Sequence, residues 1–213
     1  MKSLPCGIYG ITAEEFANGR SNIQCALEMA KGGVSILQYR EKNNDKSIRR
    51  KYEECKEIRK ITSDYGILFI VNDFIDIALS VNADGIHIGQ DDIPLIEANK
   101  LAEGMIVGIS THSPEQAQKA ITENAGYIGV GPIFKTYTKK NVCEPVGLEY
   151  LDYIVKNTDI PFVAIGGIKK HNIEDVLSKG AKTIALVTEI VSAEDIAGEV
   201  KKIKEIINNY FDI

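Results

Sequence analysis

Residues 82–89 read NADGIHIG, residues 124–131 read NAGYIGVG and residues 180–187 read GAKTIALV. In each stretch, small residues that include an alanine join the end of a helix-like segment to a short apolar run. The three stretches form a weak internal repeat of one connection, from helix to strand. Because this connection recurs where helices and strands alternate along a chain, the repeat favours an α/β fold.

Strand-length apolar runs recur along the whole chain. They are rich in β-branched residues and almost continuously apolar, which is typical of strands that are covered on both faces, as in a parallel sheet. The eight runs cover residues 6–12, 34–40, 67–73, 85–90, 106–110, 127–131, 162–167 and 183–188. We therefore predict a parallel sheet of eight strands.

Helix-like segments separate these runs. The clearest helix start is a capping-box pattern with Ser113 at the N-cap, Pro114 at N1 and Gln116 at N3. The longest segment is mostly polar and carries one apolar stripe, which indicates an outer helix with a single buried face. The main segments span residues 21–33, 45–66, 113–126 and 192–211.

The alternation of eight strands with helices predicts a single (β/α)8 TIM barrel that spans residues 1–213. An open, doubly wound α/β sheet is the alternative. A nucleotide-binding sheet of that kind usually carries G-x-G-x-x-G after an early strand, and no such motif follows the early strands here.

The composition narrows the class of protein. Of the 213 residues 44% are hydrophobic, which is enough for a full core, and the formal net charge is −5. A general nucleic-acid binder is usually basic, so no nucleic-acid partner is expected. No apolar run reaches the roughly 18 residues of a membrane span, and the first residues lack the apolar core of a signal peptide, so neither a membrane span nor a signal peptide is expected.

The cysteine pattern bears on the cellular compartment and on metals. Cys6, Cys25, Cys55 and Cys143 form no CxxC pair, and no histidine stands at metal-ligand spacing from any of them. A zinc or iron–sulfur site is therefore not expected. Free thiols are typical of a reducing compartment, so we predict a cytoplasmic protein.

Polar side chains gather at one end of the predicted barrel. A TIM barrel has its active site at the C-terminal ends of its strands, and six of the eight predicted strand ends carry charged or hydrogen-bonding side chains. The strand-entry ends read mostly Gly, Ala and Pro. The exit residues are Gln38, Arg40, Lys42, Asn72, Asp73, Gln90, Asp91, Asp92, Ser110, His112, Thr136, Thr138, Lys139, Gly166, Gly167 and Thr188. This asymmetry predicts an enzyme.

Simpler interpretations exist for several of these polar residues. Asn72 and Asp73 could cap the helix that follows them, and Asp91 or Asp92, which precede Pro94, could be an N-cap.

The three histidines have simpler interpretations too. His87 alternates inside a strand and is expected to be a hydrogen-bonded interior histidine, while His112 and His171 are expected to be polar loop residues.

The predicted mouth combines cations (Arg40, Lys42 and Lys139) with carboxylates (Asp73 and Asp92). Each bare carboxylate would repel a phosphate by roughly 4 kcal/mol at about 4 Å and an effective dielectric constant near 20. A divalent ion between them reverses that sign. Oxygen ligands without His or Cys suit Mg2+, so this set of charges predicts a diphosphate substrate bound with Mg2+.

A second phosphate group is expected elsewhere in the mouth. Gly167 and the end of the eighth strand correspond to the usual phosphate site of TIM barrels, and a glycine pair before a helix leaves backbone N–H groups free. No nucleophile or acid–base pair stands out. Catalysis would then depend on positioning and on stabilising a diphosphate as it leaves.

Seven motifs closely resemble the thiamine-phosphate synthase (thiamine-phosphate pyrophosphorylase) family. They follow the family's order, cover nearly the whole chain and are together highly specific. They are QYREK (38–42), VNDFIDIAL (71–79), ADGIHIGQDD (83–92), VGISTHS (107–113), YIGVGPIFKTYTKK (127–140), VAIGGI (163–168) and ALVTEI (185–190).

The resemblance implies a transferase of thiamine biosynthesis. In that family, 4-amino-2-methyl-5-(diphosphooxymethyl)pyrimidine and a thiazole phosphate give thiamine phosphate and pyrophosphate in an Mg2+-dependent, dissociative substitution. A pyrimidinylmethyl cation forms when the diphosphate leaves, which agrees with the absence of a candidate nucleophile.

The resemblance also implies a role for each matched residue. It assigns Mg2+ to Asp73 and Asp92, and a catalytic role to Arg40, Lys42, Ser110 and Lys139. It assigns binding of the pyrimidine diphosphate to Gln38, Tyr39, Arg40, Glu41, Lys42, Asn72, Ser110 and Lys139. It assigns binding of the thiazole phosphate to Thr136, Tyr137, Thr138, Gly167, Val187 and Thr188.

The sequence departs from the family pattern at Tyr137, where smaller or acidic residues are common. What Tyr137 contributes to the threonine loop (residues 136–138) is open. One alternative is a thiazole tautomerase of the same fold, which should not need Asp73, Asp92 and Lys139. Another is a non-catalytic regulator that binds thiamine precursors. The tautomerase is disfavoured because those three residues are retained, and the regulator is disfavoured because the Asp73 and Asp92 pair is intact. The oligomeric state is left open.

Overall fold

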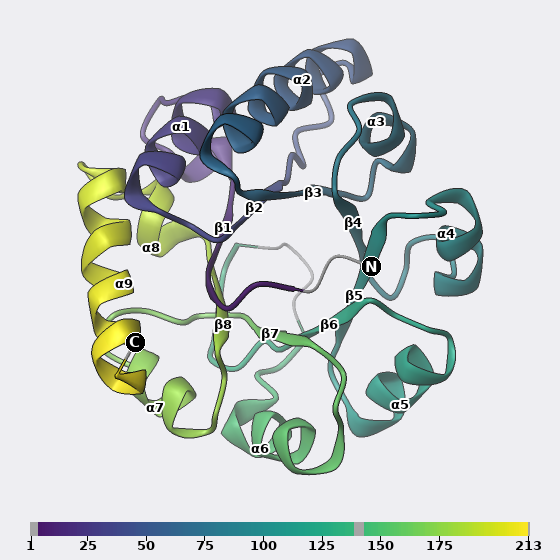
Figure 1. Cartoon of the computed structure of the whole chain (residues 1–213), viewed down its shortest axis with the longest axis vertical. Helices are drawn as coiled ribbons and strands as arrows, with labels where there is room; N and C mark the ends of the chain where they lie inside the picture. The colour runs from purple at the N-terminus through teal and green to yellow at the C-terminus, as the bar shows by residue number, and fades with distance from the viewer. Residues whose placement is uncertain (1–3, 139–142, 213) are drawn as a thin grey trace.

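Eight parallel strands close into a barrel, in sequence order, with the helices around its outside (Figure 1). The computed structural model describes residues 4–138 and 143–212. The strands are β1 Gly7–Ile11, β2 Ile36–Tyr39, β3 Leu68–Asn72, β4 Gly85–Ile88, β5 Ile106–Thr111, β6 Tyr127–Val130, β7 Phe162–Ala164 and β8 Thr183–Leu186. The predicted (β/α)8 barrel is confirmed, and the doubly wound alternative is wrong because β1 pairs with β8.

Most strands end earlier than the sequence predicts. The apolar run at 162–167 becomes a strand of three residues, because Gly166 and Gly167 adopt positive φ angles of 102° and 65°. Strand β2 likewise ends at Tyr39. Lys42 therefore lies beyond the strand, and the alternation predicted for Gln38, Arg40 and Lys42 does not extend to it.

Side-chain caps start helices at Ser21, Ser47, Ser113 and Asp195. Ser21 and Gln24 form a complete capping box, whereas Ser113 accepts from the Gln116 N–H while the Gln116 side chain bonds the N–H of His112 instead. The helices are α1 Asn22–Gly32, α2 Ile48–Tyr65, α3 Ile75–Ser80, α4 Leu95–Leu101, α5 Pro114–Thr122, α6 Gly147–Asn157, α7 Ile173–Ser178, α8 Thr188–Val191 and α9 Ile196–Phe211, with a 3-10 turn η1 at Glu14–Phe16.

Apolar residues fill two layers. The larger layer lies between the strands and the outer helices. The smaller one fills the inside of the barrel and includes two tyrosines, Tyr9 and Tyr127. Both faces of each strand are therefore covered, which explains why the strand sequences are almost continuously apolar.

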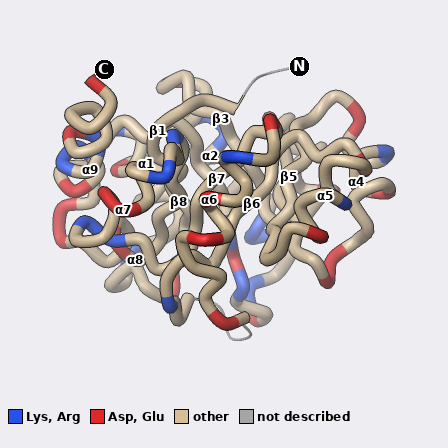
Figure 2. The backbone as a smooth tube through the Cα atoms, turned by 90° about the horizontal axis from the view of Figure 1, so that it is seen from below, with Lys and Arg blue, Asp and Glu red and all other residues tan. Residues whose placement is uncertain are grey.

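Charged residues of both signs are spread over the outer elements when the barrel is seen from the side (Figure 2). This mixture is typical of a solvated surface. In the described part of the chain, no helix combines the length and the apolarity that crossing a membrane requires.

Candidate active site

A cavity of about 640 Å³ opens at the C-terminal ends of the strands. Its position is that of the active site in TIM-barrel enzymes. The predicted site residues that line it are Gln38, Arg40, Asn72, Ser110, Thr136, Tyr137, Thr138, Gly167, Val187 and Thr188. The structure thus brings together residues from strand ends that are far apart in the sequence.

The end of β2 divides its residues between the cavity and the outside of the barrel. Side chains alternate along a strand, so Gln38 and Arg40 line the cavity while Tyr39 faces outward and donates to Glu54 Oε2 at 2.8 Å. Glu41 bonds Lys46 at 2.6 Å and does not line the cavity either. The side chains of Tyr39 and Glu41 thus help to hold the barrel's outer elements together. Lys139 lies outside the described residues.

Lys42 and Asp73 form an ion pair between the ends of β2 and β3. The Asp73 N–H donates to the carbonyl of His87 at 3.0 Å, which fixes Asp73 against the end of β4. Phe74, without a side-chain cap, stands at the N-cap of α3. Neither Asn72 nor Asp73 therefore caps helix α3, and the capping interpretation is wrong.

Asp92 folds back on the end of β4. Its Oδ2 accepts from the N–H of Gly89 at 2.6 Å. Helix α4 has Pro94 at its N-cap without a side-chain bond, so the interpretation of Asp91 or Asp92 as an N-cap is wrong.

Asp73 and Asp92 are the two carboxylates at these strand ends that could hold a divalent cation. The β3–β4 register pairs Asn72 with His87, so Asp73 and the Gly89 turn that holds Asp92 lie at the same end of adjacent strands. Carboxylate oxygens alone suit Mg2+, which keeps several waters and takes one or two protein carboxylates.

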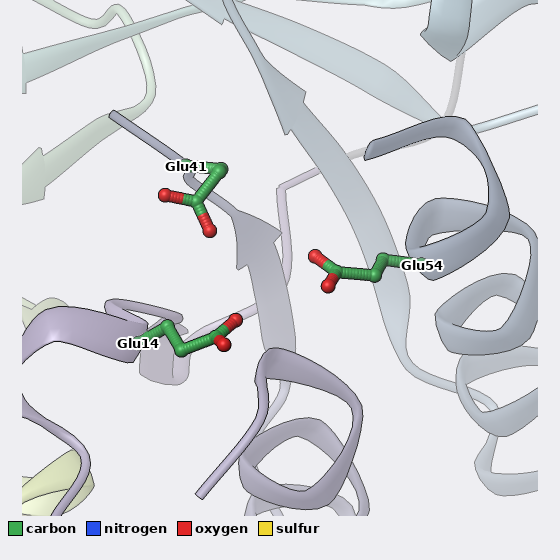
Figure 3. Close-up of side chains that lie close together, drawn as sticks. All are labelled: Glu14, Glu41 and Glu54. Carbon is green, nitrogen blue, oxygen red and sulfur yellow. The ribbon is translucent and has the colours of Figure 1, made fainter. Parts of the chain in front are cut away.

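A second carboxylate cluster lies behind β2, where Glu14, Glu41 and Glu54 point toward one another (Figure 3). Lys46 Nζ bonds all three, at 2.5, 2.6 and 2.9 Å respectively. Burial alone would raise the pKa of Glu41, but hydrogen bonds from Lys46 and the Asn43 N–H outweigh it, so that pKa is lowered. Lys46 already supplies the positive charge that such a cluster needs.

The three histidines lie closer to the cavity than the sequence indicates. His87 is a buried interior histidine, as predicted, with Nδ1 2.9 Å from the Tyr127 hydroxyl and Nε2 2.9 Å from Ser110 Oγ. His112 and His171 lie in loops, as predicted, and both also line the cavity. His112 Nδ1 lies 2.5 Å from the Gly131 carbonyl oxygen. Residue type alone gave no signal for this placement.

Arg40 is the buried cation of the cavity. Its Nη2 lies 3.5 Å from the carbonyl oxygen of Thr138, which ties the end of β2 to the threonine loop after β6. Burial lowers the Arg40 pKa, and the charges of Asp73, Glu15 and Glu41 oppose that effect. A guanidinium stays charged throughout the range in which proteins fold.

The threonine loop presents hydroxyls rather than its aromatic ring. Thr136 Oγ1 and Thr138 Oγ1 lie 3.1 Å apart and both residues line the cavity. Tyr137 is 78% exposed, with Lys135 Nζ 5.6 Å from its ring centroid. Tyr137 therefore stands at the rim of the cavity.

Gly166 and Gly167 bring bare backbone to the cavity. A Cβ on Gly167 would lie 2.5 Å from the Lys135 carbonyl oxygen, and one on Gly166 would lie 2.5 Å from Pro132 Cα. Within the described residues the Gly167 N–H has no hydrogen-bond acceptor. An N–H of this kind, beside the start of α8, suits a phosphate oxygen.

A closed (β/α)8 barrel whose mouth combines a buried arginine, paired hydroxyls and an open backbone amide is typical of one enzyme class, the TIM-barrel enzymes that act on small molecules. The family described as thiamine monophosphate synthase matches residues 8–190. The chain belongs to this family, as its motifs predict.

Individual relatives agree. The chain is 56% identical to the thiamine-phosphate synthase of Pelotomaculum thermopropionicum over 210 residues, which are 98% of this chain and 95% of the relative. It is 50% identical to that of Caldicellulosiruptor saccharolyticus over 204 residues, 95% of this chain and 91% of the relative. The thiamine phosphate pyrophosphorylase of Pyrococcus furiosus has a similar structure, with a TM-score of 0.88, 35% identity and 96% of each chain covered.

Proposed function

We propose that the protein is a thiamine-phosphate synthase that transfers the pyrimidinylmethyl group of 4-amino-2-methyl-5-(diphosphooxymethyl)pyrimidine to the nitrogen of a thiazole phosphate. The observation that carries this proposal is the single cavity shared by the strand-end residues of β2, β3, β5, β7 and β8 and the threonine loop. The curated relatives named above are synthases, and they give no support to a thiazole tautomerase or to a non-catalytic regulator.

The reaction is a substitution at the methylene carbon of the pyrimidine. The bond from this carbon to the diphosphate oxygen breaks, and its electron pair leaves with pyrophosphate. The lone pair of the thiazole nitrogen then forms the new carbon–nitrogen bond, so neither a protein nucleophile nor a proton transfer is required. The protein's contribution is to hold the two reactants in line and to stabilise the negative charge of the leaving group.

Arg40, Lys42, Ser110 and Lys139 are the proposed contacts of the diphosphate half, with Gln38 and Asn72 beside them. Arg40 suits a leaving diphosphate because it is buried and its planar guanidinium can bind two oxygens at once. Lys42 contacts the substrate only if it turns from Asp73, which is possible because its side chain is 46% exposed.

Asp73 and Asp92 are the proposed holders of Mg2+. When bound there, Mg2+ would neutralise part of the diphosphate charge that the two carboxylates otherwise repel. A metal at Asp73 would take the place of the Lys42 ammonium, which would then be free to bind the diphosphate.

The thiazole phosphate is proposed to lie against Gly167, Val187 and Thr188. The support is the open Gly167 N–H and the crowded backbone there, which leaves no room for a side chain. The hydroxyls of Thr136 and Thr138 face the same cavity.

We also propose that the protein works in the cytoplasm and needs no nucleic-acid partner. The support for the cytoplasm is that all four cysteines are free thiols, two of them exposed, which suits a reducing compartment.

One assay tests the proposed function. Both substrates are supplied with Mg2+, or with a chelator in its place, and pyrophosphate and thiamine phosphate are measured. We expect equal amounts of both products with Mg2+ and neither with the chelator. Isomerised thiazole without pyrophosphate would identify a tautomerase, and binding without turnover would identify a regulator.

A further inference from the structure

Five polar side chains form one continuous hydrogen-bonded chain across the inside of the barrel. Gln38 Nε2 donates to the Tyr9 hydroxyl at 2.8 Å, and the Tyr9 and Tyr127 hydroxyls lie 2.8 Å apart. The Tyr127 hydroxyl lies 2.9 Å from His87 Nδ1, and His87 Nε2 lies 2.9 Å from Ser110 Oγ. The two ends of this chain, Gln38 and Ser110, are proposed pyrimidine contacts.

The barrel interior is built to hold this chain. The members come from β2, β1, β6, β4 and β5, and each is at least nine-tenths buried. Gly108 leaves room for the ring of Tyr127, because a Cβ there would lie 2.1 Å from the ring carbons. The hydrogen-bonded chain depends on a specific fit between buried strands, and its members are not polar side chains on a solvated surface.

The direction of the hydrogen bonds follows from the Gln38 end. The amide N–H can only donate, so the Tyr9 oxygen accepts there. In the described structure the Tyr9 hydroxyl has one other partner, Tyr127, and either hydroxyl could donate there; the buried Tyr9 hydrogen is satisfied within the described residues only in the direction from Tyr9 to Tyr127. Burial raises the pKa of both phenols, which therefore stay protonated at neutral pH.

The same direction continues to Ser110. In this direction the Tyr127 hydrogen goes to His87 Nδ1, which requires a neutral imidazole with its hydrogen on Nε2. The Nε2 hydrogen would then go to Ser110 Oγ. The hydroxyl hydrogen of Ser110 is then available to a ligand in the cavity, and so is the carbonyl oxygen of the Gln38 amide.

We propose that Tyr9, Tyr127 and His87 are positioning residues that fix which end of this chain accepts and which donates, and that this polarity selects an aminopyrimidine. The inference rests on the proposed function and deepens it. A 4-aminopyrimidine offers an exocyclic N–H donor beside a ring-nitrogen acceptor. The Gln38 carbonyl matches the donor, and the Ser110 hydroxyl matches the acceptor.

The proposal predicts discrimination between two closely related ring edges. A 4-oxopyrimidine presents an acceptor beside a ring N–H, which is the reverse order and leaves buried groups unpaired. A site built to hydrogen-bond one pattern rejects the other strongly. Tyr127→Phe removes the donor to His87 Nδ1, so we expect it to weaken this selection by about tenfold.

The first test reads the His87 tautomer directly in the full chain. Nitrogen NMR of the imidazoles is simplified because the sequence has three histidines, and His112→Gln and His171→Gln assign the signals. We expect neutral His87 with its hydrogen on Nε2 in the wild type and a mixture of tautomers in Tyr127→Phe. A hydrogen on Nδ1 in the wild type would overturn the proposal.

The second test is kinetic and uses a matched control. We expect Tyr127→Phe and Tyr9→Phe to raise KM for the pyrimidine diphosphate about tenfold and to leave KM for the thiazole phosphate unchanged. Tyr150→Phe also removes a buried hydroxyl bond, 2.8 Å to Thr111 Oγ1, but Tyr150 does not line the cavity. Equal kinetic effects of Tyr127→Phe and Tyr150→Phe would contradict a positioning role.

Failure of the proposed function is distinguishable from failure of this inference. A wild-type protein that makes no thiamine phosphate refutes the synthase and leaves the tautomer measurement intact. An active synthase in which His87 carries its hydrogen on Nδ1 refutes only the proposed direction of the hydrogen bonds.

Discussion

The Lys46 ammonium lies 2.6 Å from the carboxylate of Glu41, and the same ammonium reaches Glu14 and Glu54. These partners come from η1, from the loop after β2 and from α2. Lys46 therefore ties three elements together, and its partner Glu41 directly follows Arg40, the buried cation of the cavity, in the sequence. The shape of the β2–α2 loop depends on this contact.

Lys46→Met should destabilise the fold and loosen this loop. Glu41 and Glu54 are almost fully buried, so removing their common cation leaves buried negative charges, at a cost of about 3 kcal/mol. We expect a lower midpoint in urea unfolding and a higher KM for the pyrimidine diphosphate. Lys60→Met, which removes an exposed pair with Glu57, is the control and should change neither.

The same cluster should make stability depend on pH in the acid range. The Glu41 pKa is lowered on folding, so its contribution is complete above the ordinary glutamate value of about 4.3 and is lost as the pH falls through the folded value. Glu41→Gln should therefore be less stable than the wild type at neutral pH, and the difference should shrink below about pH 4.3. Urea unfolding over this range measures it, and a difference that grows toward acid would contradict it.

The fold was predictable because each strand is covered on both faces and reads as a short apolar run, which needs only local sequence. The mouth was predictable in part, because alternation along β2 places Gln38 and Arg40 inside. The Lys46 cluster and the Tyr9–Tyr127 contact were not predictable, since each depends on strand register and on packing between distant segments. The short β2 also removed Lys42 from the face that alternation assigned to it.

Gly167→Ala should weaken binding of the thiazole phosphate. Gly167 has φ of 65°, and a Cβ would lie 2.5 Å from the Lys135 carbonyl oxygen, so backbone must move at the proposed phosphate site. We expect at least a roughly tenfold higher KM for the thiazole phosphate. Gly104→Ala introduces similar strain at φ of 84° with nothing within 4 Å, and should lower stability without changing this KM. An equal KM effect in both variants would argue against a phosphate site at Gly167.

Arg40→Lys should not be conservative. A lysine keeps the charge but loses the planar fork and the contact with the Thr138 carbonyl oxygen at 3.5 Å. We expect kcat/KM for the pyrimidine diphosphate to fall about tenfold to a hundredfold. Arg59→Lys is the matched control. The Arg59 guanidinium bonds the Asp84 carboxylate at 2.8 Å, and neither residue lines the cavity, so the kcat/KM of this variant should be that of the wild type. If Arg40→Lys kept the wild-type kcat/KM, a point charge alone would be enough to bind the leaving diphosphate.

Asp92→Asn should raise the Mg2+ requirement while the fold survives. Asp92 is exposed, and an asparagine can still accept from the Gly89 N–H through its side-chain oxygen, so the turn after β4 is retained. The missing charge should raise the Mg2+ concentration for half-maximal pyrophosphate release by at least about tenfold. The adjacent Asp91, which is also exposed, is the control, and Asp91→Asn should follow the wild-type titration. If Asp92→Asn titrates like the wild type, the metal lies elsewhere, because a direct ligand cannot lose its charge without weakening the ion's binding.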